Sequence, residues 1–255
     1  MNGAFHVGAV GLEAQQRALD TIAGNISNIN TVAFKRSDVR FSEVLATGVD
    51  AAARGDAGAG NASAGVRAEA APMIDNPGRV QRTGNAMDLA IEGRGFLEVM
   101  GPAGQTLLWR GGALSIGEGG LLSTASGLPL KAALSVPHDA SAIEVGPDGI
   151  VRVKTGDAGE AVEIGQLMLV KSDNPSALTR LDGGYYRAAD ETRLTEAAPG
   201  EDGVGTFVQG ALEGSNVDLA SEMVQLLLIQ RAYGANAQVV QAADQLMGLA
   251  NGLRR

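Results

Sequence analysis

Long helical patterns occupy the two ends of this chain, and the sequence between them has a different character. Residues 18–35 read ALDTIAGNISNINTVAFK, and residues 212–233 read LEGSNVDLASEMVQLLLIQRAY. Both segments space their apolar residues as an α-helix does, and both are rich in Asn, Gln and Ser. The sequence between them is Gly-rich and strand-like. This order predicts a mixed α and β fold in which paired terminal helices enclose an inserted antiparallel β domain, a plan that suits a polymerising subunit better than a compact enzyme.

The first helix is predicted over residues 4–29. One stripe of apolar residues at a spacing of three to four, with Gly8 and Gln15 in its two gaps, resembles a coiled-coil repeat. The stripe consists of Phe5, Leu12, Leu19, Ile22, Ile26 and Ile29. Asn25, Asn28 and Asn30 gather at the end of this segment, where Asn is better tolerated than in a helix interior.

The second helix is predicted over residues 218–250. Ser215, Asn216 and Asp218 are competing N-caps, and Glu222 lies in the first turn. Two adjacent apolar stripes follow: Leu219, Met223, Leu226, Tyr233, Ala237, Val240 and Met247 in one, and Ile229, Ala232, Val239, Ala243, Leu246 and Leu253 in the other. An apolar face this wide predicts more than one neighbour. The alternative is a terminal helix docked on its own domain.

The middle of the chain contains two kinds of sequence. Residues 48–71 are rich in Gly and Ala with few large apolar groups, so we expect them to be mobile or to order only on contact. From 73 to 210 the period is that of strands. Residues 87–99 form two runs around Gly93-Arg94-Gly95, residues 142–153 read as a hairpin with Pro147-Asp148-Gly149 in its turn, and 167–170 and 205–208 are further candidates.

Composition excludes several function classes. The formal net charge of −9 argues against a nucleic-acid partner, which needs clustered Lys and Arg. There is no cysteine, and the two histidines, His6 and His138, lie far apart, so zinc binding is not expected. No phosphate-binding loop or nucleophile elbow is present. We therefore expect no catalytic residue, cofactor or metal site, and a structural role.

The charge is distributed unevenly. Residues 1–36 hold three basic and two acidic residues, residues 213–255 hold three basic and four acidic residues, and the middle therefore holds the whole −9. Nearly neutral ends can pack side by side without repulsion, although an ordinary acidic surface would give the same numbers. No apolar stretch approaches the length of a membrane span, and no signal peptide is visible. We expect a cytoplasmic protein or one exported without cleavage of its N-terminus.

Three motifs resemble the flagellar rod and hook protein family. Residues 25–36 (NISNINTVAFKR) are similar to its N-terminal signature N-x-x-N-x-x-T-x-G-F-K, residues 84–99 (GNAMDLAIEGRGFLEV) to its strand pair TGNPLDLAIDGDGFF, and residues 210–233 to its C-terminal G-x-LE-x-SNV…EM…QRAY. They occur in the family's order. The chain departs from the pattern at Ala33, where Gly is usual, at LWRGGAL (108–114), which replaces Y-T-R-x-G-x-F, and at NPSAL (174–178).

The resemblance implies a helical polymer. Residues 1–34 with 214–255 would form a discontinuous, coiled-coil-like inner domain, 35–72 a Gly/Ala-rich linker region, and 73–213 a β-rich outer domain. Phe34 would anchor the chain where it leaves the first helix. The residues expected at the assembly interface are Leu12, Leu19, Ile22, Asn25, Ile26, Asn28, Ile29, Asn30, Phe34, Ser215, Asn216, Met223, Leu226, Ile229, Gln230, Tyr233, Val240 and Met247.

The resemblance also implies a place and partners. It predicts a subunit of the rod of the flagellar basal body, in particular its distal part, which spans the periplasm and transmits torque from motor to hook. The partners would be copies of the chain, other rod and hook subunits, bushing ring proteins around the rod, and the type III export apparatus, with no nucleic acid and no membrane span. A proximal-rod or hook-type subunit is the alternative within the family.

Two alternatives belong to other classes. One is a glycan hydrolase of the cell wall, whose only support is the carboxylates of the middle segment. Two close carboxylates with perturbed pKa in a cleft would favour it. The other is a monomeric β binding domain with helical termini.

Overall fold

The computed structural model describes residues 2–45, 63–156, 160–189 and 192–252. The chain divides into two compact units, a helical unit and a β unit, each with most of its residue contacts within itself. The helical unit contains Met1–Ser27, Ser37–Ala71 and Asp218–Arg255, and the β unit contains Asn28–Arg36 and Pro72–Val217. The fold is thus mixed α and β, as the sequence predicted.

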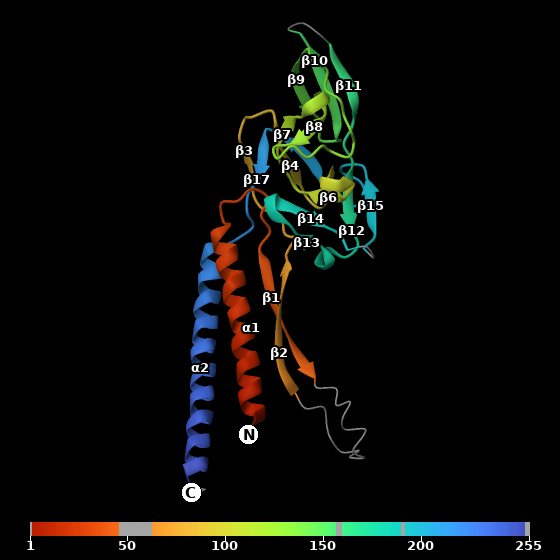
Figure 1. The fold of residues 1–255 in the computed structure, drawn as a ribbon. Coiled ribbons are helices and arrows are strands. Elements are labelled where there is room, and N and C mark those ends of the chain that lie inside the picture. Colours follow the sequence, from red (N-terminus) through yellow and green to blue (C-terminus); the bar gives the residue numbers. More distant parts are fainter. Residues whose placement is uncertain (1, 46–62, 157–159, 190–191, 253–255) are drawn as a thin grey trace, which may run out of the picture. The chain divides into compact units, whose positions relative to one another are not determined.

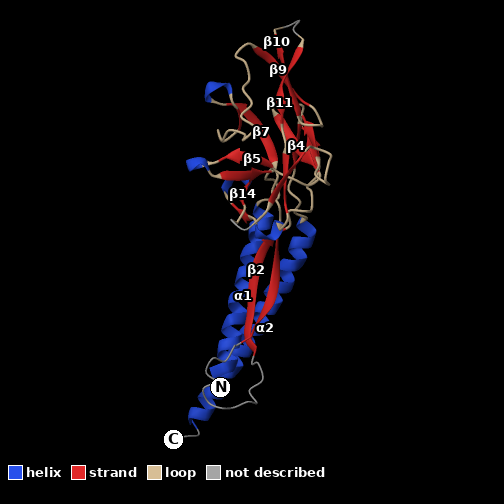
Figure 2. Ribbon diagram, turned by 90° about the vertical axis from the view of Figure 1, so that its right-hand side faces the viewer, coloured by secondary structure: helices blue, strands red, loops and turns tan. Residues whose placement is uncertain are grey.

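The helical unit contains two helices and a pair of strands. α1 (Asn2–Ser27) and α2 (Leu219–Gly252) lie side by side and run in opposite directions (Figure 1). β1 (Ser37–Leu45) and β2 (Ser63–Pro72) pair with each other, and β1 packs against α1 (Figure 2). The prediction of both helices is confirmed, with their ends moved by one or two residues.

Strand β2 bears on one expectation. Residues 48–71 were expected to be mobile or to order only on contact; residues 63–71 lie in a strand that pairs with β1, and 48–62 fall outside the described residues. Pairing uses backbone groups, so small side chains suffice for it. The run Val66-Arg67-Ala68-Glu69 also alternates apolar and charged residues, and Ala68 is buried. This period of two was the signal of a strand in a stretch otherwise classed by composition.

The β unit contains short strands, and all the pairings with a defined register are antiparallel. The strands are β3 Val80–Arg82, β4 Asp88–Glu92, β5 Leu97–Met100, β6 Thr106–Trp109, β7 Gly111–Ile116, β8 Leu122–Thr124, β9 Ala140–Val145, β10 Ile150–Thr155, β11 Ala161–Gln166, β12 Leu169–Ser172, β13 Thr179–Arg180, β14 Tyr185–Arg187, β15 Leu194–Ala197, β16 Thr206–Gln209 and β17 Ala211–Glu213. They form the sheets β16-β4-β7-β8, β13-β14-β6-β5, β11-β10-β9, β12-β15 and β17-β3. Short 3-10 turns lie at Pro102–Gly104, Glu118–Gly120, Pro175–Ala177 and Asp182–Gly184.

The strands predicted from the sequence are present. β4 and β5 flank the glycine turn at 93–95, and β9 and β10 form the predicted hairpin, in which Val145 is opposite Val151. Gly149 in its turn has φ 80°, a conformation that glycine adopts without strain. The candidates at 167–170 and 205–208 correspond to β12 and β16, each displaced by one or two residues.

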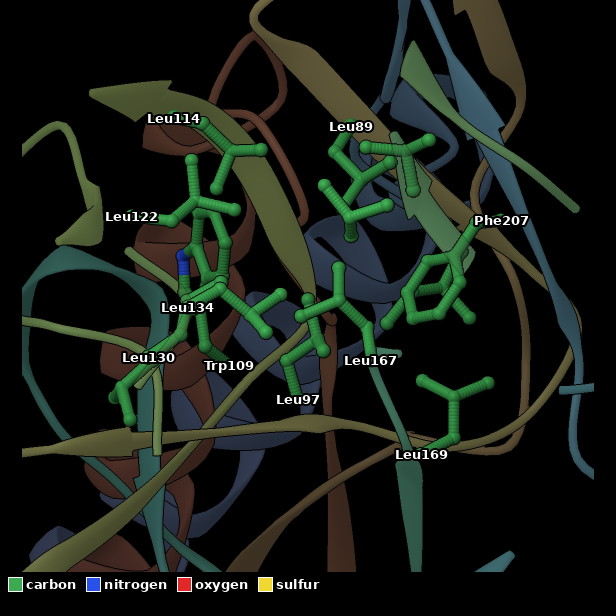
Figure 3. Close-up of a cluster of buried hydrophobic side chains, with 14 of the residues drawn as sticks. Leu89, Leu97, Trp109, Leu114, Leu122, Leu130, Leu134, Leu167, Leu169 and Phe207 are labelled. Carbon is green, nitrogen blue, oxygen red and sulfur yellow. The ribbon is translucent and has the colours of Figure 1, made fainter. Parts of the chain in front are cut away.

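Two clusters of buried apolar residues lie in the β unit, and Figure 3 shows the larger one. Its large members come from many strands and include Leu89, Leu97, Trp109, Leu114, Leu122, Leu130, Leu134, Leu167, Leu169 and Phe207. Burying one such side chain stabilises a fold by about 1.5–3 kcal/mol. The β unit therefore has its own apolar core.

Candidate functional site: an apolar helical surface and a buried clasp

Helix α2 is unusually apolar for a helix on a protein surface. Its 34 residues include only three charged ones, Glu222, Arg231 and Asp244. Eight large apolar side chains on it are between 37% and 64% exposed: Leu219, Met223, Val224, Leu227, Leu228, Tyr233, Val239 and Leu246. So much exposed apolar side chain on one helix is typical of an interaction site. We call these eight residues the α2 surface.

The α2 surface overlaps the predicted interface only in part. Met223 and Tyr233 belong to both, and Gln230 is also exposed. Three predicted residues, Leu226, Ile229 and Val240, are half-buried, and the side chain of Met247 lies outside the described ones. The prediction omitted Leu227 and Leu228. The run LLLI at 226–229 was the available signal, because one helix face cannot bury four consecutive residues.

Helix α1 meets α2 through small residues. A Cβ added to Gly8 would lie 2.7 Å from Cγ2 of Val240, and one added to Gly11 would lie 3.2 Å from Nδ2 of Asn236. Further along α1, Ala14 and Ala18 are buried. Small residues at this spacing let two helix backbones approach closely.

The larger apolar residues of α1 are less buried than the predicted stripe suggests. Ile22 is fully buried, whereas Leu12, Leu19 and Ile26 are half-buried. The side chain of Phe5 lies outside the described ones. The half-buried residues therefore keep apolar surface available to further neighbours.

Asn25 joins three elements of the helical unit. Its Nδ2 donates to the backbone oxygen of Ser37 (2.9 Å) and to Oε2 of Glu222 (3.1 Å), and its Oδ1 accepts from the backbone N–H of Ser37 (2.9 Å). Asn25 and Glu222 are 2% and 0% exposed. The end of α1, the start of β1 and the first turn of α2 are thus fixed at one buried point.

Asp218 caps α2. Its Oδ1 accepts from the backbone N–H groups of Ala220 (2.8 Å) and Ser221 (3.3 Å). Of the other two predicted caps, Ser215 accepts from the N–H of Val217 (3.3 Å). Asn216 has a separate role in the β unit.

Within the β unit, two segments far apart in sequence pair side by side. The N–H of Ala33 donates to the backbone oxygen of Glu213 (2.7 Å), and the N–H of Asn216 donates to that of Phe34 (3.2 Å). The Oδ1 of Asn216 accepts from the N–H of Arg36 (2.6 Å). Residue numbers rise together along both segments, so they run parallel. We call residues 33–36 with residues 213–216 the clasp.

A buried ion cluster fixes the clasp. Nζ of Lys35 donates to Oε1 of Glu213 (2.5 Å) and Nε of Arg110 to its Oε2 (3.0 Å), and all three side chains are at most 1% exposed. The N–H of Gly78 also donates to Oε1 of Glu213 (2.8 Å). Lys35 also donates to the backbone oxygen of Asn76 (3.0 Å), and the Arg110 guanidinium donates to backbone oxygens of Ile91, Gly93 and Gly95.

The cluster holds two cations and one anion. Burial, and next the charge of Arg110, lowers the pKa of Lys35 to about 8, although the Glu213 carboxylate opposes this. Burial also raises the pKa of Tyr186, which lies in the electrostatic range of Arg110 and Glu213, to about 12. Sequence reasoning missed this cluster, although Lys35, Arg110 and Glu213 each lie in one of the stretches compared with the family. A charge inside a mostly apolar motif was the available signal.

Phe34 lies in the clasp and its side chain is buried. The guanidinium of Arg180 lies 3.8 Å from the centre of its ring, a cation–π contact, and burial lowers the pKa of Arg180. Ala33 beside it has φ 54°, the left-handed region. Of the other predicted residues here, Asn28 and Ile29 are half-buried and Asn30 is exposed.

Among the described residues, no group of three or more His, Cys, Asp and Glu could hold a metal ion. No described helix combines the length and apolarity needed to cross a membrane. A cavity of about 210 Å³ is lined by Asp75 and Asp173 together with Arg94 and Lys171, and Asp75 is ion-paired with Arg94 (3.4 Å).

Three family models match the chain in sequence order. Residues 5–35 match "Flagella basal body rod protein", residues 90–153 match "Flagellar hook protein FlgE/F/G D1 domain", and residues 208–253 match "Flagellar basal body rod FlgEFG protein C-terminal". The first contains residues 33–35 of the clasp, and the last contains residues 213–216. The resemblance drawn from the motifs is thereby confirmed.

Curated relatives match over the whole length. The flagellar basal-body rod protein FlgG of Caulobacter vibrioides is 32% identical over 98% of this chain and 99% of its own, and that of Borreliella burgdorferi is 33% identical over 100% of both. The rod protein FlgF of Rhizobium meliloti is 32% identical over 86% of this chain and 84% of its own.

Proposed function

Because this chain belongs to the flagellar basal-body rod protein family, we propose that it is a structural subunit that polymerises through its terminal helices into the rod. The rod would transmit torque from motor to hook. The observation that carries the proposal is the α2 surface, with eight large apolar side chains exposed on one helix. The role is that of a building element rather than a catalyst, and the relatives are named as rod proteins.

The distal rod is the favoured place within the family. The FlgG relatives align over nearly the entire chain, whereas the FlgF relative aligns over 86% of it. The GLEAQQ run at 11–16 is also FlgG-like. A proximal-rod role of the FlgF type, or a hook-type role, is the second candidate.

Assembly would proceed by burial of apolar surface between copies. Each Å² of apolar area removed from water contributes about 25 cal/mol, and ordering a residue's backbone costs about 1–2 kcal/mol. Isolated helices are marginally stable in water, and helices in proteins gain most of their stability from packing. Order at the chain ends would therefore be completed only at the growing tip, where neighbours are present, with coiled-coil-like packing of α1 and α2 between copies.

The contacts between copies would be head-to-tail and would not close into a ring, which gives a helical tube. In this arrangement 1–34 and 214–255 form the inner domain and 73–213 the outer domain. Other rod and hook subunits would contact its ends, bushing ring proteins would surround it in the periplasm, and the chain would reach it unfolded through the type III export apparatus without cleavage.

Replacing Leu227 and Leu228 by Gln tests the proposal. These side chains are 54% and 59% exposed, so the change should leave the subunit folded and raise the concentration at which tubes form by at least about tenfold. The matched control is Val162→Gln, an equally exposed apolar residue (59%) in the β unit. Electron microscopy and sedimentation measure the outcome. Tubes from the Leu227/Leu228 variant at the wild-type concentration would reject the proposal.

A further inference from the structure

We propose that the clasp is a mechanical clamp that resists shear. Tension applied to the β unit at its two ends, residues 28 and 217, would be borne by the clasp before it reaches the β sheets. Glu213 holds the two halves of the clasp in position. The inference deepens the proposed function, because a subunit that transmits torque must pass force between its helices and the rest of the chain.

The first step is the closure of a long loop. Lys35 and Glu213 are 178 residues apart in sequence and form a buried ion pair. Nearly all of the β unit, together with Ser37–Ala71 of the helical unit, therefore lies between the two halves of the clasp in sequence. A force applied to the chain on both sides of the clasp cannot extend the loop until the clasp opens.

The second step is the direction of loading. The halves of the clasp are parallel, since Ala33 bonds to Glu213 and Phe34 and Arg36 bond to Asn216. α1 precedes residue 33 and α2 follows residue 216, so opposite pulls act at opposite ends of two parallel segments. Such a pull loads every bond at once, whereas antiparallel segments pulled from one end would open bond by bond.

The third step is the buried charge. Opening the clasp would separate Glu213 from Lys35 and leave a charge without its partner in the interior. Breaking one side of a buried ion pair is strongly unfavourable. The carboxylate also holds the Gly78 N–H, and Arg110 ties it to backbone oxygens at residues 91–95, so the clasp is anchored to the strands themselves.

Single-molecule pulling on the full chain tests the clamp. The chain has no cysteine, so Asn30→Cys and Ala220→Cys, both at exposed positions, give unique handles on either side of the clasp. We expect no extension until a rupture opens the clasp together with the Asn25–Glu222 bond, which joins the same two sides of it. The rupture should free a loop of up to about 600 Å at roughly 3.5 Å per residue. Glu213→Gln should shorten the lifetime at constant force at least about tenfold, since hydrogen bonds to charged groups are among the strongest.

Glu144→Gln is the matched control. Glu144 pairs with Lys154 in the same unit, but both side chains are about half exposed, so the lifetime should not change. Glu213→Gln with the wild-type lifetime would overturn the clamp.

Hydrogen exchange on the wild-type chain gives a second test if the Glu213 variant does not fold. The amides of Ala33 and Asn216 should exchange as slowly as those of core strand β4, and fast exchange at either would overturn the clamp. The two proposals fail separately. A chain that forms tubes but lacks the force-resistant step rejects the clamp alone, and a chain with that step that never forms tubes rejects the rod function.

Discussion

The Nδ2 of Asn25 donates to Oε2 of Glu222 across 3.1 Å, although 197 residues separate the two in sequence. Both side chains are buried, and the same amide also bonds the backbone of Ser37 in both directions. One amide group therefore bonds the end of α1 both to the start of β1 and to the first turn of α2. The helices are joined at this end by directed bonds, whereas at Gly8 and Gly11 they are joined by close backbone approach.

Asn25→Ala should destabilise the helical unit. The variant loses three hydrogen bonds at a buried site and leaves the Ser37 backbone groups without these bonds, so we expect a loss of about 1–3 kcal/mol in its free energy of unfolding. Urea unfolding followed by helical circular dichroism measures it. Asn30→Ala is the control, because Asn30 is exposed and its loss should cost less than about 0.5 kcal/mol. Equal effects of the two changes would contradict the joining role of Asn25.

The sequence located the Asn cluster but could not rank its members. Asn25, Asn28 and Asn30 all lie where a helix was predicted to end, and each is reasonable there on local grounds. What distinguishes Asn25 is contact with Glu222, and no local pattern reports a contact across most of the chain. The helices themselves were predictable because their period and the Asp218 cap are local properties.

Gly8→Leu should separate the two helices. Even a Cβ at this position would lie 2.7 Å from Cγ2 of Val240, and valine is stiff at χ1, so the helix backbones must move apart. We expect a lower midpoint of thermal unfolding for the helical unit. Gly24→Ala is the matched control on the same helix, since nothing lies within 4 Å of its added Cβ. That change should raise helix stability by up to about 1 kcal/mol. A Gly8 variant that unfolds at or above the wild-type temperature would contradict the close approach.

The small-residue face of α1 shows why the interface was only partly predictable. Hydrophobicity patterns weight Leu and Ile, so the predicted stripe followed Leu12, Leu19 and Ile26, which are half-buried. The buried positions Ala14 and Ala18 carry little apolar area and give a weak signal. In the same way, the alternation in β2 was hidden, because the composition of residues 48–71 predicted a segment that is mobile or orders only on contact.

Ala33→Gly should stabilise the β unit. An L-residue in the left-handed region costs roughly 1–2 kcal/mol, and Ala33 has φ 54° at a position where the family usually has Gly. Glycine removes that strain, but the variant loses a buried methyl group and its unfolded chain has more conformational entropy, and both of these effects are destabilising. We therefore expect a net increase of up to about 1 kcal/mol in the free energy of unfolding. Ala133 has φ 48° and is exposed, so Ala133→Gly isolates the backbone effect. Calorimetry of both variants measures it; a loss of stability in both would contradict the strain argument.

The stability of the β unit should depend on pH through Lys35. Its pKa is about 8 in the folded chain against 10.5 for an ordinary lysine, because burial and the charge of Arg110 disfavour its ammonium form. Between these two values the unfolded chain binds more protons than the folded one, so the contribution of Lys35 to the free energy of unfolding rises with pH.

Replacement of Lys35 by Met removes this dependence. Below pH 8 Lys35 is protonated in both the folded and the unfolded chain, so the buried ammonium lowers the free energy of unfolding by its full amount. From pH 8 to about 10.5 Lys35 loses its proton in the folded chain but keeps it in the unfolded chain, and this destabilisation is relieved. We therefore expect the stability difference, wild type minus Lys35→Met, to increase over that window and to be flat between pH 6 and 7. Chemical unfolding of both chains at matched pH values measures the difference. Lys154→Met is the control, because Lys154 lies in a half-exposed ion pair with Glu144. A stability difference between wild type and Lys35→Met that falls from pH 8 to 10 would contradict the buried cluster of two cations and one anion.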